Sequence, residues 1–498
     1  MSLMGLDIGT SGSKCTLFNE AGNAIAFAYQ DYPIIHSHSG YAELNPNEVW
    51  QAVQKVIYQV TRDYQGAPIQ ALSISSFGES AVPVGVNGEV LGNSILYTDS
   101  RGQLEAKRLQ VNLGGEQIMA LTGIPVHPMY TINKIMWIKE HQPEIYLKTW
   151  KFMLFGDFIA YQLTGIAMID YSLASRTMAM NITQKAWEPA IMEAAGIDSH
   201  LFSELVPSGH IIGTVSKKIA ATIGLSPKTL VVAGGHDQAC AALGAGVLQA
   251  GQAIDGIGTV ECIVPTFKQP VLNKSMLQHN FNCAPHTLPN HYLTYAFNFT
   301  GGSLLKWYVE CYGQIEAAEA RRRGISVYDI FNELAGTDPT ELLVIPHFAG
   351  SGTPFMNPAA KGMIYGLSFE TTPAHIYRGL LEGITYEMLY NLECLELAGI
   401  KVDTLKAVGG GAKSELWMQM KADIMGRKVE TLAISEAGTM GTAILAGIAS
   451  GVYPSYETAV EQLVKVKRTY YPNPKITEIY QANYARYKKL SSLVREGL

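Results

Sequence analysis

The chain has 498 residues, of which 47% are hydrophobic and 16% are charged, so it can build more than one large buried core. Its net charge of −6 argues against non-specific nucleic-acid binding, which needs a clustered positive field. The sequence contains no apolar run of the roughly 18 residues that would suggest a membrane span. Its six cysteines are scattered without a CxxC pair. These features predict a cytoplasmic protein of two or three domains with reduced thiols.

The first predicted element is a β-hairpin in residues 4–18. A short apolar strand that carries Asp7 leads into a Gly-Thr-Ser-Gly turn, and a second strand begins near Lys14. Glycine lets an anion approach the main-chain N–H groups closely, and Thr10 and Ser11 add hydroxyl groups, so this turn suits phosphate. The alternative is an ordinary hairpin, because Gly and Ser are the usual turn residues.

A helix is predicted over residues 47–63 from its apolar spacing, and a buried strand over residues 70–77. Glu79 follows this strand without a basic neighbour in the sequence, so we expect substrate hydroxyls, together with Arg101, to complete its hydrogen bonds. Asp99 is a second candidate for binding substrate hydroxyls. A local ion pair between Asp99 and Arg101 is the alternative.

A strand near residues 229–232 runs into a helix of small residues, with Asp237 at the junction. A carboxylate is stabilised at a helix N-terminus, and side chains at strand ends face a cleft, so Asp237 suits a general base for a hydroxyl group. The alternative is an N-cap, a position that Asp often takes. The Gly- and Ala-rich residues 244–251 are the predicted connector between domains 1–245 and 246–498.

The second half repeats the first pattern. Residues 252–267, about 250 residues after the first hairpin, again read as strand, turn and strand, with Gly258 and Thr259 in the turn. Two hairpins of the phosphate-binding type, one in each half, are what a duplicated domain that holds a nucleotide between its halves needs. Strands and helices alternate in both halves, with further helices predicted at residues 373–396 and 440–452, which favours an α/β fold.

Two more glycine-rich segments precede predicted helices. Gly301 and Gly302 stand before a helix for which Ser303 is the expected N-cap, and the glycines at residues 409–411 stand before a helix capped by Ser414. Paired glycines at the start of a helix leave main-chain N–H groups accessible to bind phosphate. Neither segment matches the Walker or the GxGxxG pattern, which argues against those nucleotide-binding folds.

Taken together, these motifs resemble the FGGY family of carbohydrate kinases over nearly the whole chain. Residues 129–141 fit the first signature of the family, and residues 362–383 resemble the second, with Gly379 where Ala or Ser is usual. Other blocks of the family are similar to DIGTSGSK, LTG…DYSLASRT (residues 163–177), GGHDQ, GTVE, FTGGSLLKW and GGGAKS, and they occur here in the same order.

The resemblance implies two actin-like (ribonuclease H-like) domains with ATP and a sugar in the cleft between them. It implies ATP-dependent phosphorylation of a small sugar or polyol, with Asp237 as the general base and Asp7 near the Mg²⁺ and phosphate groups. The implied nucleotide and phosphate contacts are Thr10, Ser11, Lys14, Thr259, Gly301, Gly302, Gly410, Gly411 and Ser414. The implied substrate contacts are Gly78, Glu79, Asp99, Met129, His236 and Gln238.

The substrate side resembles no single subgroup. Gly78 and Glu79 stand where xylulokinases usually carry Met-His and glycerol kinases Arg-Glu. Gln238 matches glycerol kinases, whereas Met129 replaces their substrate-binding Tyr and His236 replaces the Gly usual in both groups. We expect a ketopentose kinase, as a possible homodimer. The alternatives are a kinase for glycerol, another polyol or a sugar acid and, in a different class, an actin-like nucleotide-dependent binding protein without a small substrate.

Overall fold

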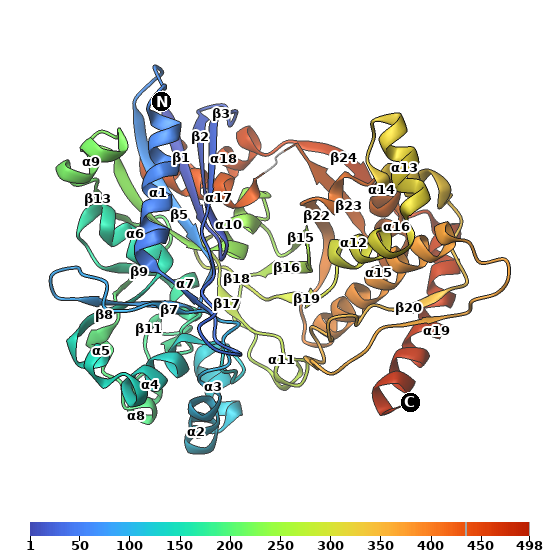
Figure 1. Cartoon of the computed structure of the whole chain (residues 1–498), viewed down its shortest axis with the longest axis horizontal. Helices are drawn as coiled ribbons and strands as arrows, with labels where there is room; N and C mark the ends of the chain where they lie inside the picture. Colours follow the sequence, from blue (N-terminus) through green and yellow to red (C-terminus); the bar gives the residue numbers. More distant parts are fainter. Residues whose placement is uncertain (434–435, 498) are drawn as a thin grey trace.

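Each half of the chain folds around its own β-sheet in the computed structural model, which describes residues 1–433 and 436–497 (Figure 1). In the first sheet, β1 pairs antiparallel with β2 and parallel with β5, which in turn pairs parallel with β14. Its strands in spatial order are β13 (Ile211–Thr214), β14 (Leu230–His236), β5 (Ile69–Ser76), β1 (Ser2–Ile8), β2 (Gly12–Asn19) and β3 (Ala24–Asp31).

The second sheet repeats this arrangement, since β15 pairs antiparallel with β16 and parallel with β22. Both predicted hairpins and the predicted repeat are therefore confirmed. The strands in spatial order are β17 (Ala284–Pro285), β18 (Tyr292–Leu293), β16 (Glu261–Phe267), β15 (Gly251–Ile257), β22 (Val402–Val408), β23 (Lys428–Leu432) and β24 (Val466–Tyr470), with β19 (Ala296–Asn298) also paired to β16.

Helices cover both sheets, and the helices predicted at residues 47–63, 373–396 and 440–452 are confirmed with slightly shifted ends. The helices are α1 (Pro46–Thr61), α2 (Gln103–Leu113), α3 (Gly115–Thr122), α4 (Thr131–His141), α5 (Pro143–Lys148), α6 (Phe155–Thr164), α7 (Tyr171–Ser175), α8 (Pro189–Ala195), α9 (Lys217–Ile223), α10 (Asp237–Gly244), α11 (Lys274–Gln278), α12 (Gly302–Tyr312), α13 (Gln314–Arg323), α14 (Val327–Leu334), α15 (Pro373–Leu397), α16 (Glu415–Met425), α17 (Ala437–Ala449), α18 (Tyr456–Leu463) and α19 (Pro474–Gly497). Short elements lie between them: β4 (Glu43–Leu44), β6 (Ala81–Gly85), β7 (Ser94–Ile95), β8 (Thr149–Leu154), β9 (Met168–Asp170), β10 (Met180–Asn181), β11 (Ala186–Trp187), β12 (Glu204–Val206), β20 (Leu343–Ile345), β21 (Met363–Tyr365) and the 3₁₀ turns at Ser199–Leu201 and Gly411–Lys413. In the described part of the chain, no helix is long and apolar enough to cross a membrane.

The two halves meet where α10 crosses α17. Although α17 lies late in the sequence, it packs against β1, β5 and β14 of the first sheet as well as against α10. The crossing depends on glycine: a Cβ at Gly244 would lie 1.9 Å from the carbonyl oxygen of Ala437, and one at Gly441 would lie 1.9 Å from that of Cys240. The backbones of the two helices therefore touch directly, and the contact includes Gly244, the first residue of the predicted connector.

The prediction that Ser303 caps α12 is wrong. The helix begins at Gly302, with Gly301 in the N-cap position. The reason is that the turn between β15 and β16 supplies the acceptors: the N–H of Gly302 donates to the carbonyl of Gly258 at 2.8 Å, and that of Ser303 donates to Thr259 at 3.1 Å. The other predicted cap is confirmed, since the hydroxyl of Ser414 accepts from the first turn of α16.

Candidate active site between the two halves

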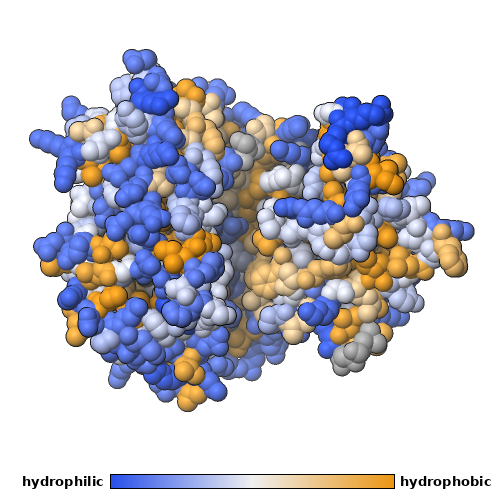
Figure 2. Space-filling view, viewed as in Figure 1, coloured by the Kyte–Doolittle hydropathy of each residue, from blue (hydrophilic) through white to orange (hydrophobic). Residues whose placement is uncertain are grey.

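A deep groove separates the two halves of the molecule (Figure 2). The parallel strands of the first sheet end together, because Ser76 at the end of β5 is the register partner of both Ile8 and His236. This register brings the segments that carry Asp7 and Asp237 to one edge of the sheet, where ligands of α/β proteins usually bind.

Asp237 is the first residue of α10, and His236 takes the N-cap position. The Oδ1 atom of Asp237 accepts from the N–H of Gln238 at 2.5 Å, and 36% of its side chain stays exposed. Burial raises the pKa of the Asp237 carboxyl to about 7, and the negative charges of Asp7 and Glu79 add to this shift. A carboxylate with a pKa near neutrality is well suited to accept a proton from a hydroxyl group.

This pKa leads to a prediction about pH. Because a general base must be unprotonated, kcat/KM for the acceptor is expected to fall about tenfold per pH unit below a pH near 7. The measurement is a pH–rate profile at saturating ATP and low acceptor concentration. A profile that stays flat down to pH 5 would exclude Asp237 as a base with a raised pKa.

Asp7, on β1, is the second carboxylate of the site. Its Oδ1 atom accepts from the hydroxyl of Ser75 at 2.8 Å, and α17 passes so close that a Cβ at Gly438 would lie 3.4 Å from the Asp7 carboxyl carbon. Burial raises the pKa of Asp7, while Ser75 and the positive charge of Lys14 oppose the rise. Because the negative charge of Asp7 raises the pKa of Asp237, a cation between the two carboxylates is electrostatically favoured.

The nucleotide-side residues lie on the two hairpin turns and on the starts of α12 and α16. Lys14 forms an ion pair of 2.8 Å with Glu436, next to the start of α17, and so links the two halves. Gly411 is enclosed, since a Cβ there would lie 2.3 Å from the Ile257 side chain, whereas a Cβ at Gly410 would meet no atom within 4 Å. The space beside Gly410 is thus open to a ligand, and Gly411 is needed for packing.

Ser11 and Thr259 are exposed at the hairpin tips.

Glu79 does not pair with Arg101, contrary to our expectation. Its carboxylate accepts from the Nε atom of Arg176 at 2.6 Å and also from an Nη atom of the same guanidinium. Arg101 instead binds Asp99, with 2.9 Å between Nε and Oδ1 and 2.6 Å between Nη2 and Oδ2. The local ion pair that was the alternative for Asp99 is therefore present, and a substrate contact by Asp99 stays a prediction.

Arg176 explains the glycine at position 78. A Cβ at Gly78 would lie 2.7 Å from the Cγ atom of Arg176 and 3.1 Å from the His236 ring, so these side chains fill the space of a larger residue. The guanidinium lies over the rings of Tyr130 and Tyr295, at 5.3 and 5.2 Å from their centroids. Glu79 reaches Arg176 from a left-handed backbone conformation with φ of 67°, which is uncommon for a residue with a side chain.

No role was predicted for Arg176, Tyr130 or Tyr295 from the sequence. Arg176 is the basic residue of the family-like block at residues 163–177, but nothing in the sequence indicates its partner 97 residues away. Tyr130 directly follows Met129, the position that was compared with the substrate-binding Tyr of glycerol kinases. Met129 itself packs, partly buried, against the hydrophobic core.

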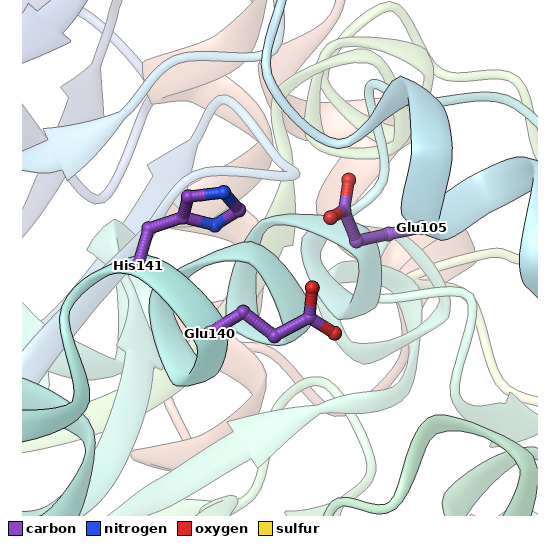
Figure 3. A group of neighbouring side chains, drawn as sticks. All are labelled: Glu105, Glu140 and His141. Atoms are coloured by element: carbon purple, nitrogen blue, oxygen red, sulfur yellow. The ribbon is translucent and has the colours of Figure 1, made fainter.

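A separate acidic group between α2 and α4 is not part of this site. Glu105 of α2 and Glu140 and His141 of α4 have ligand atoms within 4.8 Å of one another (Figure 3). Arg108 pairs with Glu140 and lies 3.7 Å from Glu105. Because this guanidinium compensates both carboxylates, the group is explained as an ion-pair cluster of one buried and one exposed carboxylate.

Comparison with known proteins adds to this geometry. The model of the FGGY family of carbohydrate kinases, N-terminal domain, matches residues 2–244, and that of the C-terminal domain matches residues 256–450. The chain is 31% identical to a xylulose kinase of Bacillus subtilis over 98% of this chain and 96% of that protein. It is 30% identical to a gluconokinase of Bacillus subtilis over 93% of this chain and 90% of that protein.

Solved structures share the whole fold. A xylulose kinase from Lactobacillus acidophilus superimposes with a TM-score of 0.90 at 25% identity, covering 100% of this chain and 99% of the other. A glycerol kinase from Plasmodium falciparum, solved with ADP, gives a TM-score of 0.87 at 20% identity, covering 98% and 97%. The predicted α/β fold with two actin-like domains is confirmed.

Proposed function

Since this chain belongs to the FGGY family of carbohydrate kinases and is an ATP-dependent sugar kinase, we propose that its acceptor is a neutral ketose of five carbons, of the class of xylulose. Relatives named as xylulose kinases and as gluconokinases are almost equally similar, so the choice between them rests on the acceptor end of the groove. Membership of the family also removes the alternative of a nucleotide-dependent binding protein without a small substrate.

The observation that carries the proposal is the ion pair between Glu79 and Arg176. An aldonate acceptor has a carboxylate, which needs an available cation when it is taken out of water. The guanidinium of Arg176 is already neutralised by Glu79 at 2.6 Å, and the carboxylates of Asp7 and Asp237 repel a further negative charge. A neutral sugar meets no such penalty, and its hydroxyls can bond to the polar groups of the pocket.

In the proposed reaction, Asp237 accepts the proton of the acceptor hydroxyl as the oxygen bonds to the γ-phosphorus of ATP and the bond to ADP breaks. Gln238 holds one carboxylate oxygen through its N–H, at 2.5 Å. The residues fit Mg²⁺, because Asp7 is a carboxylate oxygen donor fixed by Ser75. Asp7 would hold the ion, directly or through water, and the ion would neutralise charge on the phosphate oxygens.

The proposal is tested by the release of ADP with xylulose, gluconate and glycerol as acceptors. We expect kcat/KM for xylulose to exceed that for gluconate by at least about tenfold, because the site offers gluconate no free cation. Activity that is highest with gluconate would contradict the neutral-acceptor proposal, and activity highest with glycerol would favour the polyol alternative. The domain boundary at residue 245, a homodimer and a cytoplasmic location remain predictions.

A further inference from the structure

A buried side-chain contact connects the two halves at the general base. Tyr295 lies between β18 and β19 of the second half, and its hydroxyl is 2.9 Å from the Nδ1 atom of His236 in the first half. The Nε2 atom of His236 is 3.4 Å from Oδ1 of Asp237. The imidazole is thus placed between a phenol on one side and the reactive carboxylate on the other.

The chemistry of the three groups decides where the imidazole proton lies. Burial and the nearby guanidinium of Arg176 keep the pKa of His236 well below its ordinary value, so the ring is neutral and has one N–H. Burial also raises the pKa of Tyr295, so the phenol keeps its proton and can donate a hydrogen bond to Nδ1. The ring proton then stands on Nε2, which faces Asp237. The opposite tautomer would direct a lone pair at the carboxylate.

Tyr295 is held firmly in this place. Its backbone N–H donates to the Oδ1 atom of Asn282 at 3.3 Å, and the guanidinium of Arg176 lies over its ring. The same segment of the second half is joined to α10 by the hydroxyl of Thr287, which donates to the carbonyl of Ala239 at 3.2 Å. The contact with His236 is therefore built into the packing of the two halves.

We propose that Tyr295 and His236 are positioning residues for the kinase reaction, which fix the Asp237 carboxylate so that one oxygen is left to accept the acceptor proton. Oδ1 faces both the N–H of Gln238 and Nε2 of His236, and Oδ2 remains for the substrate hydroxyl. This inference rests on the proposed role of Asp237 as the base. In this proposal Tyr295 does not contact the sugar.

The test compares Tyr295→Phe with Tyr292→Phe, a buried tyrosine of β18 in the same segment. Tyr295→Phe is expected to lower kcat about ten- to hundredfold, as when the orienting partner of a catalytic group is lost, with KM for ATP within about twofold. Tyr292→Phe is expected to keep kcat. Equal losses in both variants, or full kcat in Tyr295→Phe, would overturn the inference.

A second measurement needs no variant. In the unsubstituted protein labelled with ¹⁵N-histidine, the NMR correlations of His236 are expected to report the Nε2–H tautomer at neutral pH, and the Nδ1–H tautomer would overturn the inference. The role of Asp237 as the base and the positioning role of Tyr295 can be tested separately. An active Asp237→Asn variant would remove the proposed base. An inactive Asp237→Asn variant together with an unaffected Tyr295→Phe variant would remove only the positioning role.

Discussion

Asp237→Asn is expected to lower kcat by about 10²–10⁴, the usual loss when a general base is removed, while ATP still binds. The amide has the size of the carboxylate, and its oxygen can still accept from the N–H of Gln238, so α10 is expected to start as before. It cannot accept a proton from the acceptor hydroxyl. The change also removes a negative charge beside Asp7, so ATP affinity is expected to stay the same or to rise slightly.

Two measurements separate chemistry from binding in this variant. A coupled assay of ADP release gives kcat, and calorimetry gives the affinity for ATP. Asp198→Asn is the matched control, because Asp198 caps a surface turn and its side chain is 65% exposed. Activity of Asp237→Asn within a few-fold of the unsubstituted protein would show that another group takes the proton.

The parts of the site that the sequence predicted correctly are those that lie on one short segment. Strand, glycine turn and strand are adjacent in the chain, so the hairpins at residues 4–18 and 252–267 could be recognised from local pattern alone. The position of Asp237 was equally local, because it follows from a strand that ends where a helix of small residues begins. The resemblance to the family added the order of these segments along the chain. It also implied which ligands they bind.

The parts that sequence reasoning missed are pairings across long distances. Arg101 was expected to help complete the hydrogen bonds of Glu79, yet its partner is Arg176, which directly follows α7. Tyr295 reaches His236 from the other half. The first turn of α12 shows the same effect, because the β15–β16 turn supplies its acceptors and displaces the predicted cap at Ser303.

Glu79→Ala is expected to lower the free energy of unfolding by about 3–5 kcal/mol, because it leaves the guanidinium of Arg176 buried and without its counter-charge. Only 5% of the Glu79 side chain and 6% of that of Arg176 are exposed. The matched control is Glu333→Ala, which breaks an ion pair with Arg323 at the surface, where the partners are 55% and 37% exposed. That variant is expected to lose less than about 1 kcal/mol, since water replaces the lost partner.

A third variant distinguishes the stranded charge from the lost contacts. In Glu79→Ala/Arg176→Met the uncompensated cation is gone, and the methionine side chain can pack between the rings of Tyr130 and Tyr295. If the cost comes from the unpaired guanidinium, this double variant is more stable to urea than Glu79→Ala alone. It is nevertheless expected to discriminate less between acceptors, because the polar wall of the pocket is lost with the pair. A double variant no more stable than Glu79→Ala would mean that Arg176 finds water or another partner, and that the pair does not hold the pocket in place.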